Sequence, residues 1–205
     1  GENVFDGRGG AILGTVHGGV DNDLYYLSAA VAIVDAGGTD TINARLSYVL
    51  GNGIENLTLG GFGNFYGTGN TVANVMTGNT SNNSLQGLGG NDTLLGGNGA
   101  DTLDGGTNND SLEGQNGNDR LLGNFGNDTL NGSTGNNTYL FGRGDGQDTI
   151  ASYYDATAGK LNVLQFKDGI VPADVIVARV SDNLVLTIAG TTDKVTVQYF
   201  FESDN

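Results

Sequence analysis

A nine-residue period in the middle of the chain is the feature that most restricts its fold. In the stretch GGNDTLLGGNGADTLDGG, residues 89–106, Gly, Asp and Leu return in a fixed order. Glycines stand nine residues apart at Gly51, Gly60, Gly69, Gly78, Gly87, Gly96, Gly105, Gly114, Gly123 and Gly132. Five residues after the later glycines comes the polar series Asn74, Asn83, Asp92, Asp101, Asp110, Asp119, Asp128 and Asn137. Two residues further on comes the series Met76, Leu85, Leu94, Leu103, Leu112, Leu121, Leu130 and Tyr139, so the unit is G-x-x-G-x-D-x-L-x.

This period predicts short strands joined by turns. An amphipathic helix repeats its apolar face about every 3.6 residues and tolerates Gly poorly. The Asp-Thr-Leu triplet instead suits a short strand with Leu inward, and the glycine-rich half suits a turn through positive φ angles. Two units then complete one coil, and stacked coils form two parallel sheets around a thin core of Leu. We therefore predict an all-β fold, a parallel β-roll.

The Asp series predicts that the roll holds cations. Each unit buries about one Leu, which offsets little of the conformational entropy lost by nine glycine-rich residues, and the stacked carboxylates repel one another. Carboxylate and carbonyl oxygens favour Ca²⁺, whereas Zn²⁺ prefers His or Cys and Mg²⁺ retains its water. The alternative is that each Asp only caps its turn through an Asx hydrogen bond. Capping does not require Asp at five successive nine-residue intervals, so we favour Ca²⁺.

Residues 87–131 resemble the glycine-rich nonapeptide of RTX (repeats-in-toxin) proteins, the haemolysin-type calcium-binding repeats. In that family each ion lies between the turns of neighbouring coils. The resemblance implies carboxylate ligands that pair two units apart: Asp92 with Asp110, Asp110 with Asp128, and Asp101 with Asp119. Further ligands are expected from turn residues two positions before each Asp: Gly90, Gly99, Asn108, Gly117 and Gly126. The second Gly of the family pattern is replaced by Leu88, Gln115 and Asn124, where the backbone matters more than the side chain.

Upstream of the clear repeats the pattern degenerates. Residues 51–79 keep the Gly spacing but lose Asp, so we expect ion-poor coils held by packing of Leu57, Leu59, Val75 and Met76. Further upstream, GGVDNDLYYL (18–27) and GGTDTI (37–42) restore the pattern. Three carboxylates there either bind one further ion or line a solvated turn: Asp21, Asp23 and Asp40.

Other polar residues continue the Asp series at its edges. Asn83 and Asn137, like Asn74, offer a neutral amide oxygen that binds Ca²⁺ more weakly than a carboxylate, so they are either outer ligands or plain turn residues. Downstream, YLFGRGDGQDTI (139–150) resembles the last coil of such rolls. There Asp145 or Asp148 would complete the column that Asp110 and Asp128 begin.

After residue 150 alternating apolar residues replace Gly. Strands are predicted at 161–166, 175–180, 184–189 and 194–200. The block is similar to the segment that follows the repeats in many haemolysin-type calcium-binding proteins, and we expect it to cover the end of the roll. Its aromatic residues are expected in the core of this cap, with a carbohydrate-stacking face as the alternative: Phe166, Tyr199, Phe200 and Phe201. The predicted domains are degenerate coils at 1–77, a calcium-binding roll at 78–149 and a β cap at 150–205.

Composition and motifs limit the classes of function. The 205 residues include 23 acidic and 8 basic ones, a net charge of −15 that disfavours nucleic acid and anionic membranes as partners. The sequence has no Cys, no apolar run long enough to span a membrane, and no zinc, triad or phosphate-binding motif. His17 is the only His and is expected at the surface without a catalytic role. We therefore predict a non-enzymatic module, and the first residue, Gly, suggests a piece of a longer protein.

The resemblance implies a calcium-loaded structural module of a secreted or cell-surface bacterial protein. RTX segments leave the cytosol unfolded through the type I secretion machinery and fold outside, where Ca²⁺ is plentiful, so ion binding and folding form one equilibrium. The alternative is an adhesive or polysaccharide-binding module, like the repeat modules attached to alginate epimerases. That alternative calls for an exposed stripe of aromatic and basic side chains, and only Arg120 and Phe125 interrupt the small polar residues of the repeats.

Overall fold

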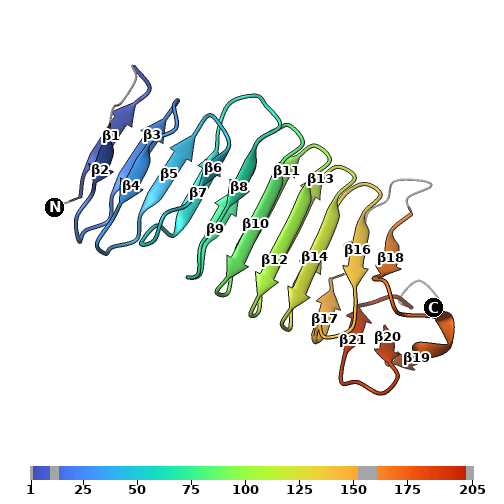
Figure 1. Cartoon of the computed structure of the whole chain (residues 1–205). Helices are drawn as coiled ribbons and strands as arrows, with labels where there is room; N and C mark the ends of the chain where they lie inside the picture. Colours follow the sequence, from blue (N-terminus) through green and yellow to red (C-terminus); the bar gives the residue numbers. More distant parts are fainter. Residues whose placement is uncertain (1, 10–13, 152–160, 202–205) are drawn as a thin grey trace.

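The structure is a computed structural model that describes residues 2–9, 14–151 and 161–201, and it shows a long parallel β-solenoid (Figure 1). In the described part of the chain the one helical element is a short 3-10 helix, η1 (Pro172–Asp174), between two C-terminal strands. None of the described residues form a helix long and apolar enough to cross a membrane. The all-β parallel roll predicted from the period is confirmed.

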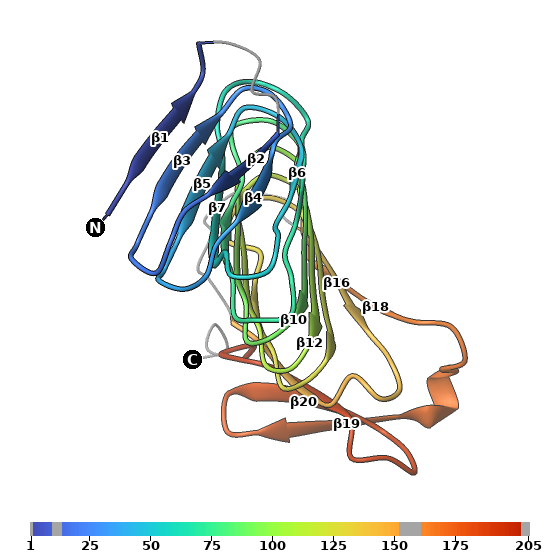
Figure 2. The same cartoon turned by 60° about the vertical axis from the view of Figure 1, so that its left-hand side comes forward.

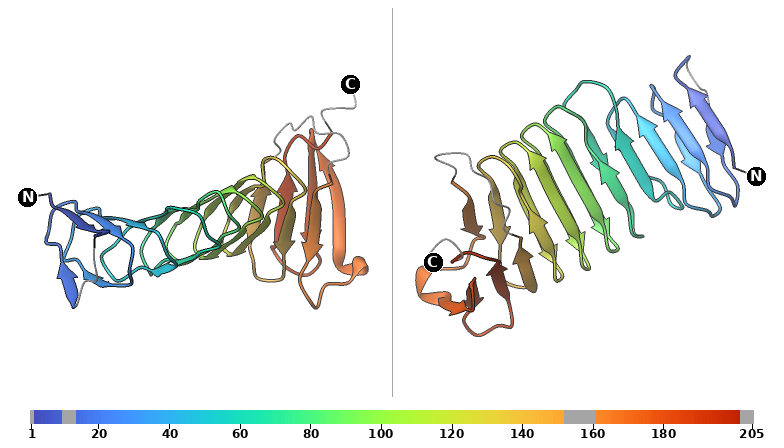
Figure 3. Two further views of the ribbon diagram at one scale, coloured as in Figure 1. Left: turned by 90° about the horizontal axis from the view of Figure 1, so that it is seen from above. Right: turned by 180° about the vertical axis from the view of Figure 1, so that it is seen from behind.

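Two long sheets form the opposite walls of the solenoid, as the turned view and the views from above and behind show (Figures 2 and 3). The larger has 12 strands, in the spatial order β1 (Val4–Gly7), β3 (Leu24–Leu27), β5 (Thr41–Ala44), β7 (Asn56–Leu59), β9 (Val75–Thr77), β11 (Thr93–Asn98), β13 (Ser111–Asn116), β15 (Thr129–Asn131), β17 (Gln147–Ile150), β21 (Lys194–Val197), β20 (Asn183–Ile188) and β19 (Val175–Val180). The second has seven, in the order β18 (Val163–Phe166), β16 (Thr138–Phe141), β14 (Arg120–Phe125), β12 (Thr102–Thr107), β10 (Ser84–Gly89), β8 (Tyr66–Thr68) and β6 (Tyr48–Val49). A two-stranded sheet joins β2 (Thr15–His17) and β4 (Ala32–Val34).

Strand register confirms that two units make one coil in the repeat region. Leu94 of β11 pairs with Leu112 of β13, two units later in the sequence, and Leu103 of β12 pairs with Leu121 of β14 at the same interval. The N-terminal coils are less regular. Along the larger sheet Val4 pairs with Leu24, Leu24 with Thr41, Thr41 with Asn56 and Asn56 with Val75, so the length of a coil changes from one to the next.

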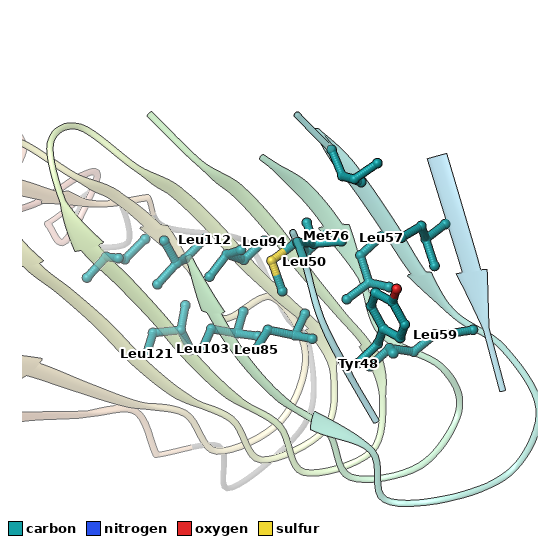
Figure 4. Packing of buried hydrophobic residues seen from close by; sticks show 14 of the residues in the cluster. Tyr48, Leu50, Leu57, Leu59, Met76, Leu85, Leu94, Leu103, Leu112 and Leu121 are labelled. Carbon is teal, nitrogen blue, oxygen red and sulfur yellow. The ribbon is translucent and has the colours of Figure 1, made fainter. Parts of the chain in front are cut away.

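The core consists of two facing rows of apolar side chains, one from each sheet (Figure 4). Leu94 and Leu112 lie in one row and Leu85, Leu103 and Leu121 in the other, each at most 1% exposed. The rows continue into the degenerate coils, where Leu57, Leu59 and Met76 are buried as predicted. Val75 is 45% exposed, so its predicted packing role is wrong. It precedes the inward Met76, and successive strand residues point to opposite faces.

The C-terminal block extends both walls of the roll. Strand β18 pairs in parallel with β16, and β21 pairs in parallel with β17, while β19 and β20 add an antiparallel hairpin to the larger sheet. Ile188 and Val195 are buried in the same core as the repeat leucines. Strand pairing therefore continues beyond residue 150. The block lengthens the solenoid by one strand on each wall, β18 and β21.

The aromatic residues of this block do not share one core. Phe166 packs against Phe141, with ring centroids 6.5 Å apart, as expected of a core residue. Tyr199 and Phe200 are 55% and 53% exposed, so the prediction of a buried position is wrong for both. They follow the end of β21 at Val197, beyond the two sheets. The ring of Phe201 lies beneath the guanidinium of Arg179, 4.5 Å from it.

Candidate metal centres along the turns

The turns that precede the five repeat Asp residues, from Asp92 to Asp128, share one backbone shape. The second and fourth residues of the unit have positive φ, as at Gly97 (106°) and Gly99 (118°). The residues that replace the second Gly keep this conformation, with φ of 77° at Leu88, 71° at Gln115 and 66° at Asn124. An L-residue is disfavoured there, so these replacements add backbone strain without changing the turn. The uniform turn places every Asp of the unit in the same position.

The Asp residues form two buried columns, one along each wall. The first column precedes or lies in strands of the larger sheet and comprises Asp92, Asp110, Asp128 and Asp148. The second column precedes strands of the seven-stranded sheet and comprises Asn83, Asp101, Asp119 and Asn137. Every Asp in them is at most 4% exposed.

Hydrogen bonds link each column from coil to coil. The N–H of Asp92 donates to Oδ1 of Asp110 at 2.8 Å, and the N–H of Asp110 donates to Oδ1 of Asp128 at 2.8 Å. In the second column the N–H of Asp101 donates to Oδ1 of Asp119 at 2.9 Å. The structure thus brings together the three Asp pairs expected from the sequence. The first column continues to Asp148, whose Oδ1 accepts the N–H of Asp128 at 3.0 Å.

The other carboxylate oxygen of each Asp has no hydrogen-bond donor. Among the described residues, the buried side-chain oxygens without a partner are Oδ2 of Asp23, Asp40, Asp92, Asp101, Asp110, Asp119, Asp128 and Asp148. A buried ionised oxygen without a partner is costly, and native structures satisfy such groups with a donor or an ion. The positions of these oxygens therefore fit a column of cations.

Backbone carbonyls converge on the same unpartnered oxygens. A Cβ added at Gly87 would meet Oδ2 of Asp92 and, at 2.5 Å, the carbonyl oxygen of Gly105 in the next coil. A Cβ at Gly96 would meet Oδ2 of Asp101 at 2.6 Å and the carbonyl oxygen of Gly114 at 2.7 Å. Sequence reasoning missed these carbonyls of the first Gly. Their signal was the unbroken Gly at position one from Gly51 to Gly132.

The turn residues named as ligands from the sequence lie beside the columns. Asn108 and Gly126 stack one coil apart, and a Cβ at Gly126 would lie 3.0 Å from Oδ1 of Asp128. Gly99 and Gly117 also stack one coil apart, and a Cβ at Gly117 would lie 3.3 Å from Oδ1 of Asp119. Gly90 (φ 104°) packs against the backbone of Val72 and Ala73, one coil earlier.

Burial raises the pKa of the column carboxylates. Desolvation raises the pKa to about 6 at Asp92, Asp101 and Asp128 and to about 7 at Asp110. It raises the pKa to about 8 at Asp148, where the charges of Asp128 and Asp145 add to the shift. The pKa of Asp119 is raised by the same cause. These carboxylates favour either a proton or a nearby cation, because desolvation penalises an isolated charge.

Asn83, Asn137 and Asp145 differ from the column Asp residues. Oδ1 of Asn83 accepts the N–H of Asn79 at 2.7 Å within its own turn, and its amide nitrogen faces the carbonyl of Phe65 at 3.4 Å. Oδ1 of Asn137 accepts the N–H of Asp119 at 2.9 Å. The Asp145 carboxylate already holds the ammonium of Lys167, with Nζ 2.7 Å from Oδ2, and it accepts the N–H of Gly142.

A separate group of carboxylates lies in the N-terminal coils. Asp23 and Asp40 lie together, as the sequence suggested, but the third member is Asp35, which sequence reasoning missed. Asp21 is exposed and is not one of the three. Asp35 stands where other units have their first Gly, five residues before Asp40, and this spacing is the signal that could have identified it.

Comparison with known families agrees with the turn geometry. The model of the RTX calcium-binding nonapeptide repeat matches four times, at residues 68–103, 77–112, 104–139 and 113–150. Residues 68–150 are RTX calcium-binding repeats. A haemolysin-type calcium binding protein related domain matches residues 183–205. RTX repeats of this type bind Ca²⁺, so Ca²⁺ is the cofactor of this β-roll.

The similarity to individual proteins covers only part of this chain and part of each of those proteins. A 66-residue stretch is 37% identical to the iron-regulated protein FrpA of Neisseria meningitidis serogroup C, which corresponds to 32% of this chain and 6% of that protein. The chain thus spans a small fraction of that relative. The crystal structure of the extracellular lipase LipA from Serratia marcescens is similar over 80% of this chain and 43% of its own, at 16% identity. The TM-score of this similarity is 0.28.

Proposed function

We propose that the chain is a calcium-dependent folding module of a larger secreted or cell-surface protein. The observation that carries the proposal is the stack of buried carboxylates, each with one oxygen that has no donor among the described residues. Such a stack is unfavourable at neutral pH until cations neutralise it. Folding and ion binding would therefore be one equilibrium.

The proposed ligands come from both columns and from the turns between coils. The carboxylates are Asp92, Asp101, Asp110, Asp119, Asp128 and Asp148, with carbonyl oxygens from the first and fourth residues of each turn. When bound, Ca²⁺ would neutralise neighbouring carboxylates and join consecutive coils. Asn83 and Asn137 would close the ends of the second column as turn residues. We leave Asp145 out of the ligand set because Lys167 already pairs with it.

Within this proposal residues 78–149 are the calcium-binding roll, residues 1–77 are coils held mainly by packing, and residues 150–205 protect the C-terminal end. The net charge of −15 and the 37 glycines disfavour collapse of the ion-free chain. The chain would remain unfolded where Ca²⁺ is scarce, as in a bacterial cytosol, and fold once outside. That behaviour suits export through the type I secretion machinery.

Circular dichroism in the far ultraviolet tests the folding part of the proposal. The full chain is expected to change from largely disordered to β on addition of millimolar Ca²⁺ and to revert with chelator, while equimolar Mg²⁺ serves as the matched control. A β spectrum that persists after chelation, in a protein that retains no metal, would overturn the proposal. Export is tested in cells that carry a type I exporter, where raising cytosolic Ca²⁺ is expected to reduce release of the chain; unchanged release would contradict the secretion role.

A further inference from the structure

Three carboxylates meet in the N-terminal coils, outside the residues matched by the repeat family. One oxygen from each of Asp23, Asp35 and Asp40 lies within 4.8 Å of the others. Glu55 adds a fourth acidic group nearby, since its Oε2 accepts the N–H of Asp40 at 2.9 Å. The matched repeats begin at residue 68, so this cluster belongs to no recognised nonapeptide.

The stretch before Asp23 keeps the residue spacing of a repeat turn, although its second and fourth residues lack the positive φ of those turns. Gly18 stands five residues before Asp23, as Gly87 stands five before Asp92. A Cβ at Gly18 would lie 2.6 Å from Oδ2 of Asp23, and it would also meet Oδ2 of Asp35. At Gly87 the corresponding second oxygen is a backbone carbonyl of the next coil. The carboxylate of Asp35 therefore takes the place of a carbonyl and adds a full negative charge.

Two carboxylate oxygens of the cluster residues lack donors. Asp23 is 3% exposed and Asp40 is fully buried, and Oδ2 of each has no hydrogen-bond partner. Their Oδ1 atoms are already used, since Asp40 accepts the N–H of Asp23 at 2.7 Å and Asp23 accepts the N–H of Asn3 at 2.6 Å. The two unpartnered oxygens thus remain available next to the carboxylate of Asp35.

Tyr25 completes the lining of the cluster. Its hydroxyl donates to Oδ2 of Asp35 at 2.6 Å and lies against the same face of Gly18. Tyr25 is 2% exposed and occupies the apolar position of the unit, two residues after Asp23. The cluster is therefore lined by oxygen atoms from β3 and from the turns that flank β2, β4 and β5.

We propose that Asp23, Asp35 and Asp40 bind one divalent cation of the Ca²⁺ type. Carboxylate oxygens without nitrogen or sulfur ligands select hard cations. Three carboxylates around one ion would leave a smaller charge imbalance than three carboxylates facing one another. The ion would fasten the irregular N-terminal coils, whose lengths vary where those of the repeats are constant.

Ion counting in the full chain tests this site. Calcium bound per chain is measured by titration calorimetry and by metal analysis for the wild type, Asp40→Asn and Asp35→Asn, with Asp21→Asn as the control from the same turns. Both cluster variants are expected to bind one ion fewer than the wild type, and Asp21→Asn the full number. An unchanged ion count in both cluster variants overturns the inference.

Two further measurements separate this site from the repeats. Asp110→Asn tests the repeat sites in the same assay. If Asp110→Asn loses ions and the two cluster variants lose none, only the N-terminal site is refuted. Terbium luminescence excited through tyrosine contains a contribution from the cluster, because Tyr25 lines it. Tyr25→Phe is expected to remove the emission that Asp35→Asn also removes, whereas equal emission from the wild type and both variants would contradict binding beside Tyr25.

Discussion

The two Asp columns are built from the same nine-residue unit, yet they close in different ways. The first column has four consecutive Asp residues from Asp92 to Asp148, each with an unpartnered oxygen. The second has two, Asp101 and Asp119, between Asn83 and Asn137. An amide supplies both a donor and an acceptor, whereas a carboxylate supplies acceptors alone. The amide at this position finds hydrogen-bond partners within the protein, whereas each column Asp leaves one oxygen without a donor.

Asn74 illustrates the self-sufficient turn. Its Oδ1 accepts the N–H of Asn70 at 2.9 Å, and its amide nitrogen donates to the carbonyls of Ile54 and Glu55 at 3.1 and 3.2 Å. Asp92, one coil later, follows a turn with positive φ at Leu88 and Gly90 and leaves Oδ2 without a donor. Coils at the Asn positions are therefore expected to be held by hydrogen bonds and packing, and coils at the Asp positions by ions.

The largest expected effect on Ca²⁺-dependent folding comes from removing the strands that follow the two columns. Truncation after Thr149 deletes β18, which pairs with β16, and β21, which pairs with β17. It also deletes the buried Ile188 and Val195. Because each coil of a solenoid is stabilised by its neighbours, the Ca²⁺ midpoint of folding should rise at least tenfold, or folding should be abolished.

Circular dichroism during Ca²⁺ titration measures the effect of this truncation. A fusion in which a soluble domain of similar size replaces residues 150–205 is the control, and it should not restore the midpoint. Identical midpoints for the truncated and full chains would show that the C-terminal block is an independent domain.

Single substitutions in the two columns give the next largest effect. Asp110 has an Asp on both sides in its column, Asp92 and Asp128, whereas Asp119 has Asp101 on one side and Asn137 on the other. If each adjacent Asp pair holds one ion, Asp110→Asn weakens two sites and Asp119→Asn weakens one. Titration calorimetry checks the ratio, with Asn83→Ala as a control that affects at most one terminal site. Equal losses for Asp110→Asn and Asp119→Asn would mean that the columns do not share ligands in this way.

The two columns are also expected to contribute differently to the pH dependence of folding. Desolvation raises the pKa of Asp110 to about 7 and of Asp148 to about 8, from an ordinary value of 3.8. A raised folded-state pKa of an acid means that the ion-free folded chain binds extra protons, so its stability is greatest below about pH 4 and is lost as the pH rises to between 6 and 8. Protons and Ca²⁺ then compete for the same oxygens.

We therefore expect the ion-free chain to show more β structure at pH 5 than at pH 8, and the Ca²⁺ midpoint to rise several-fold between pH 8 and pH 6. Asp148→Asn should flatten this dependence more than Asp101→Asn, because the pKa of Asp101 is raised only to about 6. Circular dichroism at fixed ionic strength measures both. An ion-free chain equally disordered at pH 5 and pH 8 would contradict the role of desolvation.

The repeat region was largely predictable because a single unit specifies strand, turn and ligand together. Leu94 and Leu112 had to face inward and stack one coil apart once the period was recognised. The N-terminal cluster was only half predictable: the five-residue spacing relates Asp35 to Asp40, but the approach of Asp35 to Asp23 depends on coils whose lengths vary. Exposure of Tyr199 and Phe200 was missed because alternation does not show where the last strand of a sheet ends.

The smallest expected effect concerns backbone strain in the turns of the two columns. Gln115 has φ of 71° at the position where Gly97, its partner in the neighbouring strand, has φ of 106°. An L-residue in this region costs about 1–2 kcal/mol, and the greater chain entropy of Gly offsets about 0.5–1 kcal/mol of that. Gln115→Gly should therefore stabilise the calcium-bound roll by about 0.5–1 kcal/mol without changing the number of ions bound. Urea unfolding at saturating Ca²⁺ measures the change. Gln86→Gly, within strand β10, should destabilise the roll, because it relieves no positive φ and removes a side-chain hydrogen bond to Asp104. Destabilisation by Gln115→Gly would show that the turn gains nothing from Gly and that the backbone of Gln115 is not strained.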